Sequence, residues 1–212
     1  MVPALTLINL GKKPYVETWE AMKSFTEHRD KSSNDEIWFV EHPPVYTLGR
    51  TGKAACLPKT LDIPLIYSDR GGQVTYHGPG QLVCYLLLDI RRLGLGVREL
   101  VTAIEEAVIE LIGHHGVVGE SKIKAPGVYV DGRKIASLGL RVRRGASYHG
   151  LSLNVDMDLE PFMNINPCGF EGLEMIDLMR LGVSNPIAEI RNELADILIR
   201  KIGYSDVALR IK

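Results

Sequence analysis

The chain of 212 residues is long enough to bury one substantial core, and we expect a single domain over residues 1–212. Its formal net charge of -1 offers no basic surface for nucleic acid, so we predict no nucleic-acid partner. No apolar run approaches the roughly 18 residues that span a bilayer, and the N-terminus lacks the pattern of a secretion signal. We therefore expect a cytoplasmic protein without a membrane partner.

The first 50 residues predict a strand, a helix and two further strands. LTLINLG is typical of a short strand, and EIWFVEHPPVYTLG predicts two strands separated by a corner at Pro43 and Pro44. Between them, residues 14–29 predict an amphipathic helix because their large apolar side chains recur at helical spacing. These side chains are Tyr15, Trp19, Met22 and Phe25.

The segment RGGQVTYHGPGQ, residues 70–81, places four glycines directly before the apolar run QLVCYLLLDI. The apolar run predicts a buried strand. Glycines let a backbone approach a ligand without a Cβ in the way, so the segment is a candidate ligand-lining loop. The alternative is a structural turn in which His77 is hydrogen-bonded within the core. Neither a dinucleotide fingerprint nor a phosphate-binding loop motif occurs in the sequence, which argues against nucleotide phosphates as the ligand.

The second half of the chain predicts a helix, a hairpin, a strand and a final helix. Apolar residues of period 3.6 run from Val97 to a stop near Gly113, and a similar pattern begins at Ile187. GVYV and RKIASLGLRV flank Asp131 and Gly132, a dipeptide suited to a tight hairpin. The run 147–155 alternates as a strand, with its odd-numbered side chains expected on one face. The side chains expected on this face are His149, Leu151, Leu153 and Val155. The pattern predicts an α+β fold with a mixed, largely antiparallel sheet flanked by helices.

Three cysteines at irregular spacing fit neither a disulfide framework nor a paired metal site, and we predict no metal. Cys168, between a proline and a glycine in INPCGF, is the first candidate for a reactive thiol. Cys84 lies within VCYLLL and is expected to be a small buried hydrophobe. Cys56 is ambiguous.

A reactive thiol needs a nearby cation or helix N-terminus to favour the thiolate. Lys134, His77 and His149 are the candidate helpers of Cys168. Lys134 stands in a strand that is otherwise apolar, where an ammonium would be partly desolvated and reactive. The alternative is a lysine that snorkels to solvent from the edge of the strand.

Three motifs in this order resemble the lipoyl(octanoyl) transferase family: RGGQVTYHGPGQLVCY, APGVYVDGRKIASLGLRVRRGASYHGLSLNV and NINPCGF. The resemblance covers roughly residues 36 to 175. It implies the fold of the biotin and lipoate ligase catalytic domains, in which a smaller sheet lies beside the main one. It also implies transfer of an octanoyl group from octanoyl-acyl carrier protein, through a cysteine thioester, to a lysine of an apo lipoyl domain. The acceptors would be the lipoyl domains of 2-oxoacid dehydrogenase complexes and the glycine cleavage H protein.

By the same resemblance, Cys168 matches the family's acyl-thioester nucleophile and Lys134 matches the lysine that activates it. No cofactor is implied, since thioester exchange needs no ATP. The family's substrate-binding segments match Arg70, Gly71, Gly72, Gln73, Val74, Thr75, Tyr76, His77, Ser137, Leu138, Gly139, Gly150, Leu151 and Ser152.

Two other functions stay open at this point. An ATP-dependent lipoate or biotin ligase has the same fold, a glycine-rich loop and an essential lysine, but it does not need Cys168. Its pattern also usually carries an aspartate and an asparagine where this chain has HGPGQ. A non-catalytic module that binds an acylated carrier protein is the third possibility, and the presence of both Cys168 and Lys134 argues against it.

Overall fold

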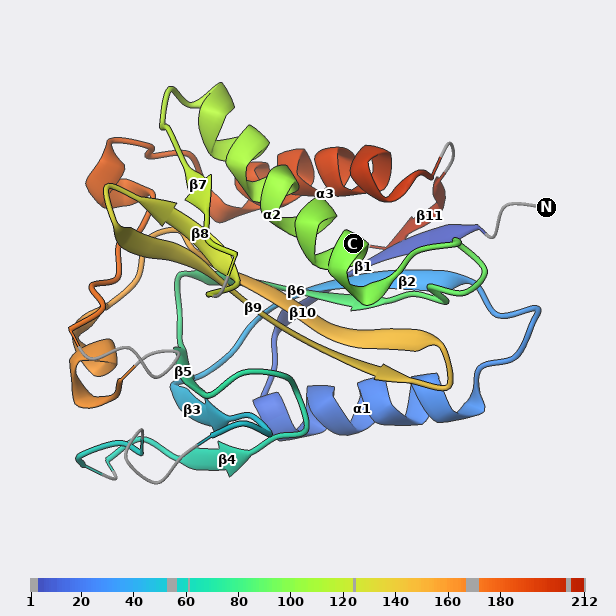
Figure 1. The fold of residues 1–212 in the computed structure, drawn as a ribbon, viewed down its shortest axis with the longest axis horizontal. Helices are drawn as coiled ribbons and strands as arrows, with labels where there is room; N and C mark the ends of the chain where they lie inside the picture. The colour runs from blue at the N-terminus through green and yellow to red at the C-terminus, as the bar shows by residue number, and fades with distance from the viewer. Residues whose placement is uncertain are drawn as a thin grey trace.

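A computed structural model of the chain describes residues 4–52, 57–60, 62–123, 125–166 and 172–204, together with the backbone of 207–211. Its main sheet has eight strands in the order β11-β1-β2-β6-β10-β9-β8-β7. β1 pairs in parallel with both of its neighbours, and the remaining pairs are antiparallel. The predicted mixed, largely antiparallel sheet is confirmed (Figure 1). The strands are β1 (Leu5–Lys12), β2 (Asp35–Glu41), β6 (Gln81–Leu87), β7 (Glu120–Ser121), β8 (Gly127–Val130), β9 (Arg133–Arg143), β10 (Ala146–Asn154) and β11 (Val207–Ile211).

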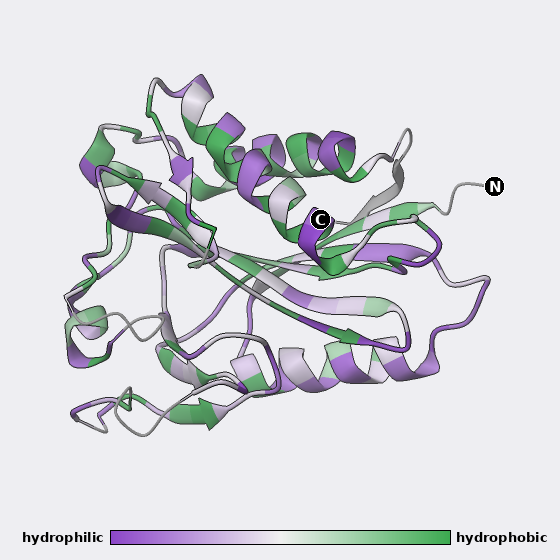
Figure 2. Ribbon diagram, viewed as in Figure 1, coloured by the Kyte–Doolittle hydropathy of each residue, from purple (hydrophilic) through white to green (hydrophobic). Residues whose placement is uncertain are grey.

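Helices cover both faces of this sheet. α1 (Tyr15–His28) lies against one face, and α2 (Val97–His114) and α3 (Ile187–Ile202) lie side by side on the other (Figure 1). α1, α2 and α3 fall where the apolar periodicity predicts them, and α2 ends one residue beyond the predicted stop. Figure 2 shows hydrophobic and hydrophilic residues alternating along α2 and α3, as expected for helices that bury one side.

The central strand β6 is buried on both sides, which explains its continuous apolar sequence. Leu82, Cys84 and Leu86 pack in the core beneath α2 and α3. Val83, Tyr85 and Leu87 alternate with them and pack beneath α1. Each large apolar side chain buried in this way contributes roughly 1.5–3 kcal/mol to stability.

Local signals set the ends of the elements that position the site. Asp131 and Gly132 both have positive φ, 49° and 78°, as the tight β8–β9 hairpin requires. α2 begins after Gly96, whose N–H donates to Oε2 of Glu99 at 2.6 Å. This contact satisfies a donor that the first helical turn would otherwise leave unpaired.

A second sheet of three strands, in the order β4-β3-β5, lies beside the first. It consists of β3 (Val45–Leu48), β4 (Leu65–Tyr67) and β5 (Val74–His77). Because β5 takes up residues 74–77, the expectation that the whole glycine segment is a loop is wrong. The side chains of Val74 and Tyr76 pack in a small apolar core under this sheet, and that packing makes part of the segment a strand. The 3₁₀ helices η2 (Glu160–Asn164) and η4 (Met179–Leu181) complete the described elements.

His149 departs from the strand alternation that its sequence predicts. Leu151 and Leu153 enter the core beneath α2 and α3, but the ring of His149 contacts the rings of Tyr148 and Tyr85. Its φ of 60° lies in the left-handed region, which a non-glycine residue adopts only where surrounding contacts hold it. The prediction that His149 shares a face with Leu151 is therefore wrong.

Candidate active site

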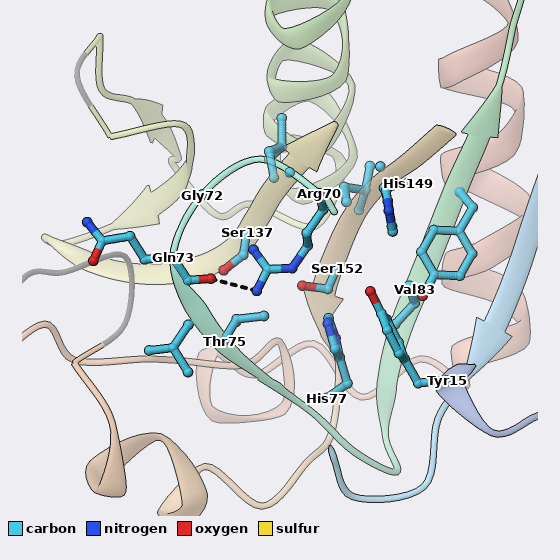
Figure 3. Close-up of a pocket in the computed structure, with 16 residues that line it drawn as sticks. Tyr15, Arg70, Gly72, Gln73, Thr75, His77, Val83, Ser137, His149 and Ser152 are labelled. Carbon is cyan, nitrogen blue, oxygen red and sulfur yellow. Dashed lines mark hydrogen bonds between the residues drawn. The ribbon is translucent and has the colours of Figure 1, made fainter. Parts of the chain in front are cut away.

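A narrow cavity of about 40 Å³ lies between the glycine segment, the paired strands β9 and β10, and the start of α1 (Figure 3). Its volume has room for only a few water molecules at about 10–15 Å³ each. The wall contains every predicted substrate-binding residue except Gly71 and Tyr76. It also contains four residues that were not predicted to bind substrate. The lining residues are Tyr15, Arg70, Gly72, Gln73, Val74, Thr75, His77, Val83, Tyr85, Ser137, Leu138, Gly139, His149, Gly150, Leu151 and Ser152.

The two predicted residues outside this wall are placed by strand geometry. Tyr76 alternates with Thr75 and His77 in β5, so its ring points to the opposite side, where it packs between Tyr46 and Phe162. Gly71 lines a neighbouring hollow of about 360 Å³, together with Val97, Val101 and Pro126 among others.

Arg70 holds the glycine segment in shape. Its guanidinium donates to the backbone oxygen of Thr47 at 2.6 Å, to Oγ1 of Thr47 at 2.9 and 3.1 Å, and to the backbone oxygens of Gly71 and Gln73 at 2.8 and 2.7 Å. The bond to Gln73 crosses the centre of the site (Figure 3). A buried guanidinium that binds three backbone carbonyls fixes the path of the loop more firmly than the loop's own sequence could.

The glycine segment lies directly against β9. The N–H of Gly71 donates to the backbone oxygen of Leu140 at 3.0 Å. A Cβ on Gly139 would come 2.9 Å from the oxygen of Gly71, so a side chain at Gly139 would force the two backbones apart. A glycine in β9 is therefore required for the loop to form one wall of the cavity.

A buried set of aromatic and histidine side chains adjoins the cavity, and two of its members, His77 and Tyr85, line the cavity itself. Nδ1 of His77 lies 2.7 Å from Oε1 of Gln81, and Nε2 of His42 lies 2.7 Å from the hydroxyl of Tyr85. Burial, together with the neighbouring His42, lowers the pKa of His77 to about 3. Burial likewise lowers the pKa of His42 to about 4, although its contact with the backbone oxygen of Lys13 opposes this. Both imidazoles are therefore neutral at pH 7.

A second polar cluster centres on Asp69, just before the glycine segment. Its carboxylate accepts hydrogen bonds from Trp19 Nε1 at 2.7 Å, from His149 Nε2 at 2.9 Å and from the Tyr148 hydroxyl. Partial burial raises the pKa of Asp69, but these three donors outweigh it and lower the pKa to about 2. Burial lowers the pKa of His149, while its bond to Asp69 acts in the opposite direction, and its buried Nδ1 makes no hydrogen bond with the residues that the structure describes.

Lys134 lies in β9, three residues before Ser137, and its side chain is fully buried. Nζ donates to the backbone oxygen of Pro126 at 2.8 Å and lies 5.2 Å from the ring centroid of Tyr129. The alternative of a snorkelling lysine is therefore wrong. The backbone of Lys134 also exchanges two hydrogen bonds with the segment that follows residue 171, with Glu174 O at 2.8 Å and Ile176 N at 3.0 Å.

Cys168 and Cys56 lie outside the described residues. Cys84 is buried in β6, as predicted, and its burial raises the pKa of its thiol well above the ordinary value. Among the residues that the structure describes, no three His, Cys, Asp or Glu side chains gather as metal ligands. No helix in the described part of the chain is long and apolar enough to cross a membrane.

The sequence motifs do not indicate Tyr15, Val83 and Tyr85 as cavity residues or Asp69 as the partner of His149, whereas His149, a candidate helper of Cys168, also lines the cavity. Tyr15 is buried on α1 and Val83 is buried in strand β6, as the sequence predicts. Nothing in the sequence indicates that the same buried faces border a cavity. For His149, its position beside Gly150 between two strand-forming runs was the available signal of an irregular backbone.

Comparison with known proteins places this chain in a family. The model of the lipoyl protein ligase A/B catalytic domain matches residues 14–199. The octanoyltransferase of Cellvibrio japonicus is 53% identical over 211 residues, which is 99% of this chain and 98% of that protein. The octanoyltransferase of Pseudomonas putida strain W619 is 58% identical over 93% of this chain and 92% of its own length.

Among solved structures, the bi-partite lipoate protein ligase of Thermoplasma acidophilum superposes with a TM-score of 0.74 at 16% identity, covering 99% of this chain and 88% of that one. This likeness confirms the expected fold. The identity and coverage of the octanoyltransferases carry the assignment further, and the chain belongs to the lipoyl protein ligase A/B catalytic domain family, together with its octanoyltransferase relatives.

Proposed function

We propose that this protein transfers an octanoyl group from octanoyl-acyl carrier protein to a lysine of an apo lipoyl domain, through a thioester on Cys168. Relatives that share more than half of its residues over nearly the whole chain are octanoyltransferases. The single structural observation that carries the proposal is the buried position of Lys134. An ammonium enclosed by protein, on a strand paired to the segment that follows Cys168, is a suitable partner for a thiolate.

In the first half-reaction, the Cys168 thiolate attacks the octanoyl carbonyl carbon and forms a new C–S bond. The bond to the carrier's phosphopantetheine sulfur breaks, and that sulfur takes a proton from the Lys134 ammonium to leave as a thiol. Backbone N–H groups of the neighbouring glycine-rich strands are the proposed donors to the oxyanion that forms between these two events.

In the second half-reaction, the neutral amine of the acceptor lysine attacks the Cys168 thioester and forms the amide. The sulfur of Cys168 leaves as a thiolate, and the proton lost by the amine goes to Lys134. The ammonium and thiolate pair is thereby regenerated, and no other reactant is consumed. Ping-pong kinetics should result.

The cavity lined by the glycine segment, β9 and β10 is the proposed acyl site. Its walls are mainly apolar and include carbon atoms of Val74, Val83, Leu138 and Leu151. Such walls suit a saturated acyl chain. The cavity volume of about 40 Å³ is smaller than the volume of an eight-carbon chain, so we propose that the cavity expands when the acyl group enters. The substrate-binding role of residues 70–77, 137–139 and 150–152 is part of this proposal.

The acceptor proteins and the cellular location of the reaction are part of the same proposal. The acceptors would be the lipoyl domains of 2-oxoacid dehydrogenase complexes and the glycine cleavage H protein, and the protein would act in the cytoplasm as one catalytic domain over residues 1–212. No cofactor is required.

Intact-mass measurement after incubation with octanoyl-acyl carrier protein and no nucleotide tests the proposal. We expect one octanoyl adduct, which Cys168→Ser abolishes and which an apo lipoyl domain discharges. The Cys84→Ser variant is the matched control and should form the adduct normally. An adduct that requires ATP would instead indicate a ligase, and tight carrier binding without any product would indicate a binding module.

A further inference from the structure

Glu105 is a buried carboxylate on a helix face that is otherwise apolar. It lies on α2 between Ile104 and Ala107, both fully buried, and its own side chain is 9% exposed. Its neighbour Glu106 points to solvent and pairs with Lys201 of α3 at 3.3 Å. A carboxylate on the buried side costs stability unless it has specific partners, so Glu105 needs an explanation that Glu106 does not.

The partners of Glu105 lie beside Lys134. Oε1 of Glu105 accepts a hydrogen bond from the N–H of Gly127 at 2.8 Å. The carbonyl of the same peptide group, the oxygen of Pro126, accepts the hydrogen bond from Nζ of Lys134, also at 2.8 Å. One peptide group therefore stands between a carboxylate and an ammonium, with its N–H toward the negative group and its C=O toward the positive one.

This arrangement is electrostatically consistent throughout. A peptide group carries a dipole of about 3.5 D, and here both of its ends face the charge that they favour. Burial raises the pKa of Glu105, while the Gly127 N–H and the charge of Lys134 act in the opposite direction. Hydrogen bonds connected in this way strengthen one another inside a protein.

Gly127 makes the close approach possible. Its φ is 143°, and a Cβ at this position would lie 2.4 Å from Cε and 2.9 Å from Nζ of Lys134. The bridging peptide thus lies in van der Waals contact with the lysine side chain and leaves Nζ little freedom to turn away from the carbonyl of Pro126.

Other described groups near Lys134 lie on β8, on the β7–β8 connection and at Glu174. Tyr129 of β8 presents its ring to Nζ, and the ammonium of Lys122, from the β7–β8 connection, lies 4.4 Å from the centroid of the same ring. Glu174 contacts Lys134 through its backbone oxygen. In contrast to these groups, Glu105 places a buried negative charge near the lysine. The two side chains are connected by the hydrogen bonds of the Pro126–Gly127 peptide.

We infer that Glu105 is a positioning residue for Lys134 and that it acts through the Pro126–Gly127 peptide to hold the ammonium in a fixed orientation within the site. The inference rests on the proposed function, in which the Lys134 ammonium favours the Cys168 thiolate and donates the first proton. It adds a residue on α2 that acts through Lys134.

Glu105→Gln removes the negative charge of this residue but keeps an oxygen that can accept its hydrogen bond. The glutamine oxygen can still accept from the Gly127 N–H, so the loop stays anchored and the melting temperature should remain within a few degrees of the parent. We expect octanoyl transfer to fall about tenfold in kcat, with KM for the octanoyl carrier unchanged. Iodoacetamide alkylation of Cys168 should move to higher pH, a shift that a purely structural role of Glu105 would not produce.

Glu106→Gln is the matched control, because it removes the same charge one residue away on the exposed side of α2. It should retain the parent turnover and alkylation profile. If Glu105→Gln does not fold, Glu105→Asp carries the test: it keeps the charge but withdraws it by one methylene, and it should lose less turnover while shifting alkylation in the same direction.

The inference is overturned if Glu105→Gln, or Glu105→Asp in its place, matches Glu106→Gln in both turnover and alkylation. Lys134→Ala and Cys168→Ser distinguish this from failure of the proposed function. Transfer that survives in those two variants contradicts the proposed mechanism. Transfer that is lost in them but unchanged in Glu105→Gln contradicts the role of Glu105 alone.

Discussion

Nε2 of His149, on strand β10, lies 2.9 Å from Oδ1 of Asp69, in the segment before the glycine-rich loop. The same carboxylate accepts from Trp19 on α1. This single carboxylate therefore ties three separate parts of the chain together at the edge of the cavity, and His149 is held in its left-handed backbone conformation at the same point.

Replacing Asp69 with asparagine should loosen this junction. An amide has one acceptor oxygen where the carboxylate has two, so at least one of the buried donors from Trp19, Tyr148 or His149 loses its partner. An unsatisfied buried donor costs about 1–3 kcal/mol, and we expect the free energy of unfolding in urea to fall by about 2 kcal/mol. Asp156→Asn, whose side chain is exposed, is the control and should change it by less than about 0.5 kcal/mol. Equal effects of the two substitutions would contradict this interpretation.

Acid should destabilise the fold in two steps. The pKa of His42 is lowered to about 4 and that of His77 to about 3, each mainly by burial. Since a histidine in the unfolded chain titrates near 6.5, the unfolded state binds more protons below that pH, and stability falls as the pH drops from 6.5 toward 4 and 3. The loss should reach up to about 2 kcal/mol for each histidine between pH 7 and 5. Asp69, whose pKa is lowered to about 2, adds a further loss below about pH 4.

Urea unfolding at several pH values measures this dependence. His77→Gln should remove part of the slope between pH 6.5 and 5, to which buried His42 and His149 also contribute, whereas His28→Gln, at an exposed site on α1, should leave the slope unchanged. A parent protein equally stable at pH 7 and pH 5 would show that these imidazoles are not buried in their neutral form.

Arg70→Lys should disorganise the glycine segment. A lysine carries the same charge but cannot reach the oxygens of Thr47, Gly71 and Gln73 together, because its donors sit on one nitrogen and not on a planar fork. We expect octanoyl transfer to fall by at least tenfold and the melting temperature to drop by several degrees. Arg91→Lys, on the exposed surface before α2, provides the control. Retention of parent activity in Arg70→Lys would mean that the guanidinium does not shape the site.

Much of the fold could be predicted because each element carries its own local pattern. α1, α2, α3, the Asp131–Gly132 hairpin and β6 all follow from apolar periodicity or turn chemistry within a single segment. β5 could not be predicted in this way, since its strand conformation depends on pairing with β3 and on the packing of Tyr76 against Tyr46 and Phe162.

The site shows the same division. The motifs around Arg70, Ser137 and Gly150 indicated the cavity walls, because each wall is a continuous stretch of sequence. The remaining lining residues come from α1, β6 and β10, and the Glu105 contact joins α2 to β8. Relationships of this kind depend on how helices pack on the sheet, which local sequence patterns do not specify.

Thiol labelling should show that Cys84 is protected in the folded protein. Cys84 is fully buried in β6, and burial raises the pKa of its thiol, so the folded protein should not be alkylated there at pH 8. Peptide mapping after brief iodoacetamide treatment should find Cys84 unmodified, and labelling in urea should find it modified. Rapid labelling of Cys84 in the folded protein would contradict its position between the two layers of helices.

Gly127→Ala should impair the site while leaving most of the fold intact. The added methyl group would lie 2.4 Å from Cε of Lys134 and 2.5 Å from the oxygen of Ala136, so either the lysine or the β8–β9 backbone must shift. Overpacking of this kind costs about 1–3 kcal/mol, and a displaced Lys134 should lower octanoyl transfer by at least tenfold.

Gly113→Ala is the matched control for this substitution. Gly113 lies near the end of α2, and a methyl group added there would meet nothing within 4 Å, so alanine should stabilise the helix by about 0.5–1 kcal/mol. The test is to measure the turnover and the free energy of unfolding in urea of both variants. Parent turnover in Gly127→Ala would show that the close contact between this glycine and Lys134 is not needed for the reaction.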